Sequence, residues 1–171
     1  MKIAITGYSG GGKSTTAQLL GEKYSIPVLH LDSVHWMENW TERPAEQSKA
    51  IVADFLAAND SWVIDGNYKA LLQAERFEQA DIIVFLSFNR FTCLFRALAR
   101  YKKYKGRTRP DMAPGCNEKF DSEFAKWILL DGRTSQKRKS YRDMCKKHSN
   151  KVVILKNQRQ LDSFLENQKN I

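Results

Sequence analysis

The sequence predicts an α/β fold in which a mostly parallel sheet is covered by helices on both faces. The chain has 171 residues, of which 42% are hydrophobic and 27% charged, so it is long enough to bury a sizeable core. Five short apolar runs alternate with segments of helical spacing, and a glycine-rich turn joins the first run to the first helical segment. We therefore expect one domain over residues 1–171.

The first two predicted strands flank a predicted helix. Residues 3–6 are an apolar run that Gly7 ends. Behind the glycine-rich turn, apolar residues recur at spacings of three and four, which indicates a helix. They are Ala17, Leu20 and Tyr24. Residues 27–32 predict a second strand that ends in Asp32.

The remaining elements alternate in the same way. Pro44 indicates the start of a helix, because proline is favoured in a first helical turn. Residues 62–66, 82–86 and 151–155 predict the other three strands. Residues 105–117 form the one long irregular segment, and loops of that length in a compact domain are usually lids or binding loops.

Residues 7–14 carry a phosphate-binding pattern. Gly7-Tyr8-Ser9-Gly10-Gly11-Gly12-Lys13-Ser14 matches G-x-x-x-x-G-K-[ST], in which glycines let the backbone N–H groups approach phosphates. Lys13 supplies charge to the β- and γ-phosphates, the Ser14 hydroxyl can bind Mg²⁺, and the next helix points its positive end at the same anion. We therefore expect ATP and Mg²⁺ as ligands. The residues expected to contact the nucleotide are Gly7, Ser9, Gly10, Gly11, Gly12, Lys13, Ser14 and Thr15.

Two carboxylates follow predicted strands at the sheet edge where open parallel sheets bind ligands. Asp65 follows an apolar strand and has the form of a Walker B acid, so we expect it to hold Mg²⁺ together with Ser14. Asp32 is positioned to orient or deprotonate an acceptor hydroxyl. The alternative for both is an aspartate that begins a turn.

Positive charge is concentrated in the second half of the chain. The formal net charge is +9, but residues 1–90 carry 8 basic and 11 acidic side chains, whereas residues 91–171 carry 20 and 8. Polyphosphate and nucleic acid are the two partners that such a segment suggests. We expect Arg100, Arg107 and Arg109 to form an arginine-bearing lid over the transferring phosphate, with Arg133 closing from the other side. An exposed, solvated surface is expected for Lys102, Lys103, Lys137, Lys139, Lys146 and Lys147.

Histidines and phenylalanines are assigned to structural roles. His30 and His35 have no partners at metal-ligand spacing, which favours structural histidines. Three phenylalanines show helical spacing near a strand end and are expected to pack in the core. They are Phe88, Phe91 and Phe95.

The composition also excludes several classes of protein. Three widely spaced cysteines, Cys93, Cys116 and Cys145, form neither a disulfide framework nor a zinc site. The longest apolar run, residues 82–88, is far short of a membrane span, and the first residues do not resemble a signal peptide. We therefore expect a cytoplasmic protein without a membrane partner.

Several motifs together resemble one bacterial family. They are the phosphate loop, His30-Leu31-Asp32, Trp36, Asn39-Trp40, Arg43-Pro44, Trp62-Val63-Ile64-Asp65-Gly66-Asn67-Tyr68, Ala80-Asp81, Gly106-Arg107-Thr108-Arg109-Pro110-Asp111-Met112-Ala113, Gly115-Cys116 and Glu118-Lys119-Phe120-Asp121. Over residues 1–157 they are similar to the DNA topology modulation proteins, which are related to adenylate kinases of the nucleoside monophosphate kinase type. The resemblance implies a three-layer P-loop NTPase with a five-stranded parallel sheet. It also implies an acceptor-side insert near 33–60, a lid near 104–122, and Asn157 near the adenine.

Two hypotheses of function follow. The first is a phosphotransferase that moves the ATP γ-phosphate to a nucleotide or small-molecule acceptor. Adenylate kinases carry an arginine shortly after the Asp-Gly pair, but Asn67 and Tyr68 follow here, so the acceptor stays open. The alternative is a nucleic-acid-binding regulator that uses ATP as a ligand, although the sequence shows no helix-turn-helix, zinc finger or RNA-binding signature.

Overall fold

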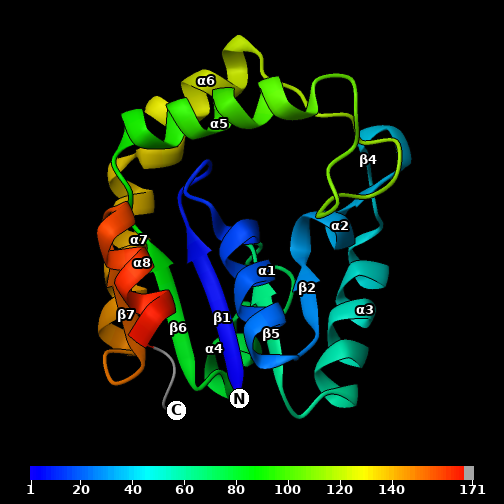
Figure 1. Cartoon of the computed structure of the whole chain (residues 1–171). Helices are drawn as coiled ribbons and strands as arrows, with labels where there is room; N and C mark the ends of the chain where they lie inside the picture. The colour runs from blue at the N-terminus through cyan, green and yellow to red at the C-terminus, as the bar shows by residue number, and fades with distance from the viewer. Residues whose placement is uncertain (168–171) are drawn as a thin grey trace.

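The computed structural model of the chain, which describes residues 1–167, confirms the α/β fold (Figure 1). Five strands form one parallel sheet in the order β2-β5-β1-β6-β7. Their bounds are β1 (Lys2–Gly7), β2 (Val28–His30), β5 (Trp62–Asp65), β6 (Ile82–Leu86) and β7 (Val152–Leu155). All five lie where the sequence predicts strands. Their carboxyl ends share one edge, as parallel strands require, and the site is built there.

Helices cover both faces of the sheet, because alternate residues of the central strand β1 point to opposite sides. Ile3 packs in a cluster with Leu20 and Phe164, whereas Ala4 packs in a second cluster with Phe77. The helices of the first face are α1 (Lys13–Tyr24) and α8 (Gln158–Asn167), in front of the sheet in Figure 1. Those of the second face are α4 (Gln73–Gln79) and α7 (Ser135–Lys147), behind it.

The segment between β2 and β5 holds short elements and one long helix. They are α2 (Leu31–His35), β3 (Trp36–Met37), a 3₁₀ turn (Glu38–Trp40), β4 (Thr41–Glu42) and α3 (Ala45–Ala58). Strands β3 and β4 pair as a small antiparallel hairpin. Pro44 directly precedes α3, as predicted. The prediction that Asp32 ends the second strand is wrong, because β2 stops at His30 and Asp32 lies in the first turn of α2.

Helices α5 (Arg90–Tyr104) and α6 (Ser122–Leu129) lie across the carboxyl end of the sheet (Figure 1). The segment 104–122, which the sequence predicts to be a lid, connects them and reaches the hairpin segment. Trp40 Nε1 donates a hydrogen bond to the Asn117 carbonyl oxygen at 3.1 Å. Met112, Ala113 and Cys116 bury an apolar cluster against Trp36 and Trp40. The segment 104–122 therefore packs against the segment 33–60 in this structure.

Two phenylalanines are not in the core. Phe88 is buried as predicted, but Phe91 and Phe95 are 61% and 67% exposed on α5. Helical spacing alone does not say which face of a helix meets the core, and α5 lies over the sheet edge rather than on a sheet face. In the part of the chain described here, no helix has the length and apolar character needed to cross a membrane.

Candidate nucleotide-binding and phosphotransfer site

The glycine-rich loop lies between β1 and α1, packed against the start of α5. Gly10 has a φ of +77°, a conformation that glycine adopts without strain. A Cβ atom added to Gly10 would lie 2.3 Å from the Cys93 carbonyl oxygen, so a side chain does not fit there. The close approach of the loop to α5 therefore depends on this glycine.

Replacing Gly10 by alanine is expected to destabilise the protein more than the same change at Gly106. Both have a positive φ, which costs a non-glycine residue about 1–3 kcal/mol, but a Cβ at Gly106 meets nothing within 4 Å. The clash at Gly10 adds about 1–3 kcal/mol, and each kcal/mol lowers Tm by about 2–4 °C in a chain of this length. Thermal unfolding of both variants measures the difference. Equal Tm values would contradict this account of the loop.

Lys13 lies beneath the glycine-rich loop, next to two carboxylates. Its Nζ donates to the carbonyl oxygens of Gly7 and Tyr8 at 3.3 and 3.4 Å. Burial lowers the pKa of the Lys13 ammonium, and the charges of Asp32 and Asp65 oppose this. The two carboxylates therefore help to keep the ammonium charged where a polyphosphate would meet the loop.

Ser14 and Asp65 come together as the sequence predicts. Ser14 Oγ donates to Asp65 Oδ2 at 3.0 Å, and the Asp65 side chain is 5% exposed. Mg²⁺ is usually held by one or two protein oxygens together with water and substrate phosphates, and this hydroxyl–carboxylate pair fits that requirement. Residues 1–167 contain no group of three His, Cys, Asp or Glu that could hold a metal ion by themselves.

His30 belongs to this cluster, which the sequence analysis missed. Its Nδ1 lies 2.5 Å from Asp65 Oδ1, so each Asp65 oxygen has a partner. Burial lowers the pKa of His30, but the hydrogen bond and charge of Asp65 outweigh burial and raise it above the usual value. The contact arises because His30 and Asp65 are neighbours in register on β2 and β5. The sequence alone does not reveal which strands pair.

Asp32 lies near Lys13 and has a defined partner of its own. Tyr68 Oη donates to Asp32 Oδ1 at 2.9 Å. Burial and the Asp32 charge raise the pKa of Tyr68, so the phenol remains a protonated donor. His35 packs against the Tyr68 ring with 4.5 Å between centroids. Tyr68 thus holds the Asp32 carboxylate, and His35 supports the Tyr68 ring.

Two of the predicted lid arginines meet on one buried carboxylate. Glu118 Oε1 accepts from Arg100 Nε at 2.8 Å, and Glu118 Oε2 lies 2.5 Å from Arg109 Nε. Arg109 Nη1 also donates to Asp111 Oδ2 at 2.5 Å. The charge of Arg100 also contributes to lowering the pKa of Lys13. Arg107, in contrast, is exposed on the lid.

Arg133 reaches the glycine-rich loop from the opposite side. Its guanidinium lies over the Tyr8 ring, 3.7 Å from the centroid. Nη2 donates to the Phe88 carbonyl oxygen at 2.9 Å, and Nε donates to that of Ile128 at 3.1 Å. The arginine therefore holds the start of the loop against the turn that follows α6.

Three further residues contact the loop and were not predicted as site residues. Arg96 Nη1 donates to the Gly11 carbonyl oxygen at 2.8 Å. Thr6 Oγ1 and the Gly7 N–H donate to Asn67 Oδ1 at 2.8 and 3.1 Å. Trp127 Nε1 donates to Ser9 Oγ at 3.2 Å. Of these three residues, only Arg96 has a signal in the sequence: it lies four residues before Arg100, on the same face of a helix.

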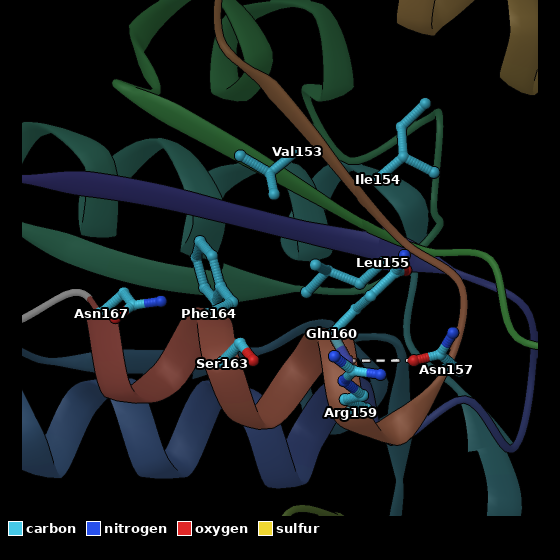
Figure 2. A pocket seen from close by; sticks show the side chains of 9 residues that line it. All are labelled: Val153, Ile154, Leu155, Asn157, Arg159, Gln160, Ser163, Phe164 and Asn167. Atoms are coloured by element: carbon cyan, nitrogen blue, oxygen red, sulfur yellow. Dashed lines mark hydrogen bonds between the residues drawn. The ribbon is translucent and has the colours of Figure 1, made fainter.

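Asn157 lies just beyond β7, and its side chain caps the start of α8. Its Oδ1 accepts from the Gln160 N–H at 3.0 Å (Figure 2). Figure 2 shows the cavity of about 640 Å³ that Asn157 lines with β7 and α8 residues such as Leu155 and Phe164. The neighbouring Gln158 accepts from Arg96 Nη2, which ties this turn to the loop. A role of Asn157 near the adenine remains a prediction.

Comparison with known proteins supports a kinase fold. No family model matches the chain. Adenylate kinases from two Clostridium botulinum strains, Loch Maree and Langeland, are each 29% identical over a 98-residue alignment that covers 46% of this chain. The alignment covers 45% of each kinase, so the chain spans less than half the length of these relatives.

Two solved structures share the fold over almost the whole chain. Shikimate kinase from Acinetobacter baumannii, in complex with shikimate, has a TM-score of 0.58 at 16% identity and covers 99% of this chain and 95% of its own. An uncharacterized protein from Eubacterium ventriosum has a TM-score of 0.54 at 18% identity and covers 98% and 95%. The chain therefore shares the fold of shikimate kinase, a P-loop kinase.

Proposed function

We propose that the protein is an ATP-dependent phosphotransferase that moves the γ-phosphate of Mg·ATP to a small-molecule or nucleotide acceptor. The observation that carries the proposal is the cluster of Lys13, Ser14 and Asp65 at the glycine-rich loop. These residues supply a cation for the phosphates and an oxygen pair for Mg²⁺. The partial similarity to adenylate kinases agrees with this chemistry.

The proposed reaction is an in-line transfer. An acceptor oxygen forms a bond to the γ-phosphorus while the bond from that phosphorus to the β–γ bridging oxygen breaks, and ADP leaves with the electron pair. For an acceptor hydroxyl, the proton passes to the Asp32 carboxylate. Bound Mg²⁺ would neutralise charge on the phosphate oxygens. Lys13, Arg100 and Arg109 would stabilise the charge that spreads over the transferring group, and the lid would exclude water.

The resemblance to DNA topology modulation proteins, and a nucleic-acid-binding role with it, remains an untested alternative. Binding to duplex DNA should weaken steeply with salt, because neutralised phosphates release counterions. A filter-binding assay from low to physiological salt measures that slope. Salt-dependent DNA binding without acceptor-stimulated ATP turnover would favour the alternative over the phosphotransferase.

Wild-type protein with Mg·ATP should form ADP faster when the correct acceptor is added, and Lys13→Ala should lose at least about 100-fold of that rate. The lysine is the one cation beneath the loop that we assign to the β- and γ-phosphates. The measurement is coupled ADP formation across nucleoside monophosphates, nucleosides and small hydroxylated or acidic compounds. Lys139→Ala, an exposed lysine on α7, is the matched control. ATP binding without stimulation by any acceptor would argue for a regulatory nucleotide-binding protein.

A further inference from the structure

A cavity of about 460 Å³ is lined by residues of α4 and α7. These are the two helices behind the sheet in Figure 1. The glycine-rich loop contributes Tyr8 and Ser9 to its lining, and the turn after β5 contributes Asn67. Apolar residues that line it include Phe77 and Met144. A volume of this size suits a small-molecule ligand. The cavity does not include the predicted acceptor residue Asp32, and nothing in the proposed chemistry yet uses it.

Three cations line this cavity without an ion-pair partner. They are Lys69, Arg133 and Lys137. No carboxylate is among the lining residues, and none of the three pairs with one anywhere in residues 1–167. In contrast, the carboxylates of the lid hold Arg100 and Arg109. The cavity is therefore a local excess of positive charge.

Neutral groups take the place of an anion around these cations. Lys137 Nζ lies 3.5 Å from the Trp127 ring centroid and donates to the Asp131 carbonyl oxygen at 2.8 Å. Arg133 lies on the Tyr8 ring. The prediction that Lys137 lies on a solvated surface is wrong, because its side chain is half-buried on the indole of Trp127. Aromatic faces attract cations but leave the charge uncompensated, so a ligand anion would bind more strongly.

The cavity opens beside the proposed phosphate site. Tyr8 contributes its ring to the cavity and its carbonyl oxygen to Lys13 Nζ, 3.4 Å away. Asn67 lines the cavity and bonds both backbone groups of Gly7. A ligand anchored by the three cations would thus lie against Tyr8 and Asn67, the residues that contact Lys13 and Gly7. The aromatic rings of Trp127, Tyr8 and Tyr141 favour a ring in the ligand.

We propose that this cavity anchors the phosphate acceptor and that the acceptor is a small ring compound bearing a carboxylate or phosphate group. That the ligand is a phosphate acceptor rests on the proposed phosphotransferase function. That the ligand is an anionic ring compound rests on the cavity alone. Phosphotransfer and anchoring involve opposite ends of the ligand. Variants of the cavity should therefore change acceptor binding and leave ATP binding unchanged.

Binding of four probes to the full chain without nucleotide tests the ligand class. The probes are phenyl phosphate, 3-hydroxybenzoate, 3-hydroxybenzyl alcohol and inorganic phosphate, measured by calorimetry. The first two combine a ring with an anion, the third lacks the anion and the fourth lacks the ring. We expect the two anionic rings to bind at least about tenfold more tightly than either partial probe. Equal affinity for the neutral alcohol would overturn the proposal.

Matched lysine variants then test whether the anionic-ring probes bind in the cavity. Lys137→Gln and Lys69→Gln are each expected to weaken the anionic-ring probes about tenfold, because each removes one charge from the cavity. Lys139→Gln removes a charge from the same helix outside the cavity, where Lys139 pairs with Asp143, and should change nothing. An equal effect of all three variants would contradict the cavity as the site.

These experiments distinguish a failure of the cavity proposal from a failure of the proposed phosphotransferase function. If anionic rings bind through Lys137 but no acceptor stimulates ATP turnover, the cavity stands as a ligand site and the phosphotransferase proposal fails. If an acceptor is phosphorylated and its KM is the same in Lys137→Gln as in the wild type, the phosphotransferase stands and the cavity proposal fails.

Discussion

Replacing Asp65 by asparagine is expected to reduce acceptor-dependent ATP turnover by at least about 100-fold. The carboxylate has Ser14 Oγ on one oxygen and His30 Nδ1 on the other, so it is fixed where the Mg²⁺ ligands are proposed. Asparagine keeps the shape but loses the negative charge, and its amide nitrogen cannot bind a metal ion. The loss should appear mainly in kcat, with a raised Mg²⁺ requirement.

Turnover measured against total Mg²⁺ at saturating ATP provides the test. Asp54→Asn, which changes an exposed aspartate on α3, is the matched control and should behave like the wild type. His30→Asn, which removes the partner but keeps the carboxylate, should have a smaller effect than Asp65→Asn. A kcat for Asp65→Asn within twofold of the wild type would show that Asp65 does not hold the metal.

Much of the sheet could be predicted because parallel strands are buried on both faces and read as continuous apolar runs. Ile82–Leu86 was predicted with its exact bounds, and the glycine-rich loop was placed by the motif and the strand and helix beside it. Asp32 was misplaced by two residues, because an apolar run does not show where a strand gives way to a short helix.

The contacts between elements could not be predicted. His30 meets Asp65 through the register of two strands that are more than thirty residues apart, and a lone histidine carries no sign of that pairing. Lys137 looks like a solvated lysine on a basic helix, and only the turn that joins α6 to α7 brings it to the Trp127 ring. Residue types and spacing identify the chemistry of the loop, whereas the ligand cavity depends on the tertiary arrangement.

Glu118→Gln is expected to destabilise the protein by about 3 kcal/mol, near the lower end of the cost of breaking a buried ion pair, because Arg100 is partly exposed. Glu118 is 3% exposed and holds Arg100 and Arg109, which come from α5 and from the lid. Glutamine retains a hydrogen-bond acceptor but leaves two neighbouring cations with only Asp111 to balance them. Tm should fall by about 6–12 °C. Turnover should also fall at least about tenfold, since the arginines are no longer held in place.

The double variant separates a charge effect from a packing effect. If Glu118 stabilises the lid by balancing the arginines, removing Arg109 as well should restore part of the Tm, so Glu118→Gln with Arg109→Gln should be more stable than Glu118→Gln alone. Asp143→Asn breaks an exposed pair with Lys139 and should leave Tm unchanged. Turnover should stay low in the double variant, because we assign Arg109 to the transferring phosphate. If the two substitutions simply add their losses in Tm, Glu118 contributes by packing and does not hold the lid through charge.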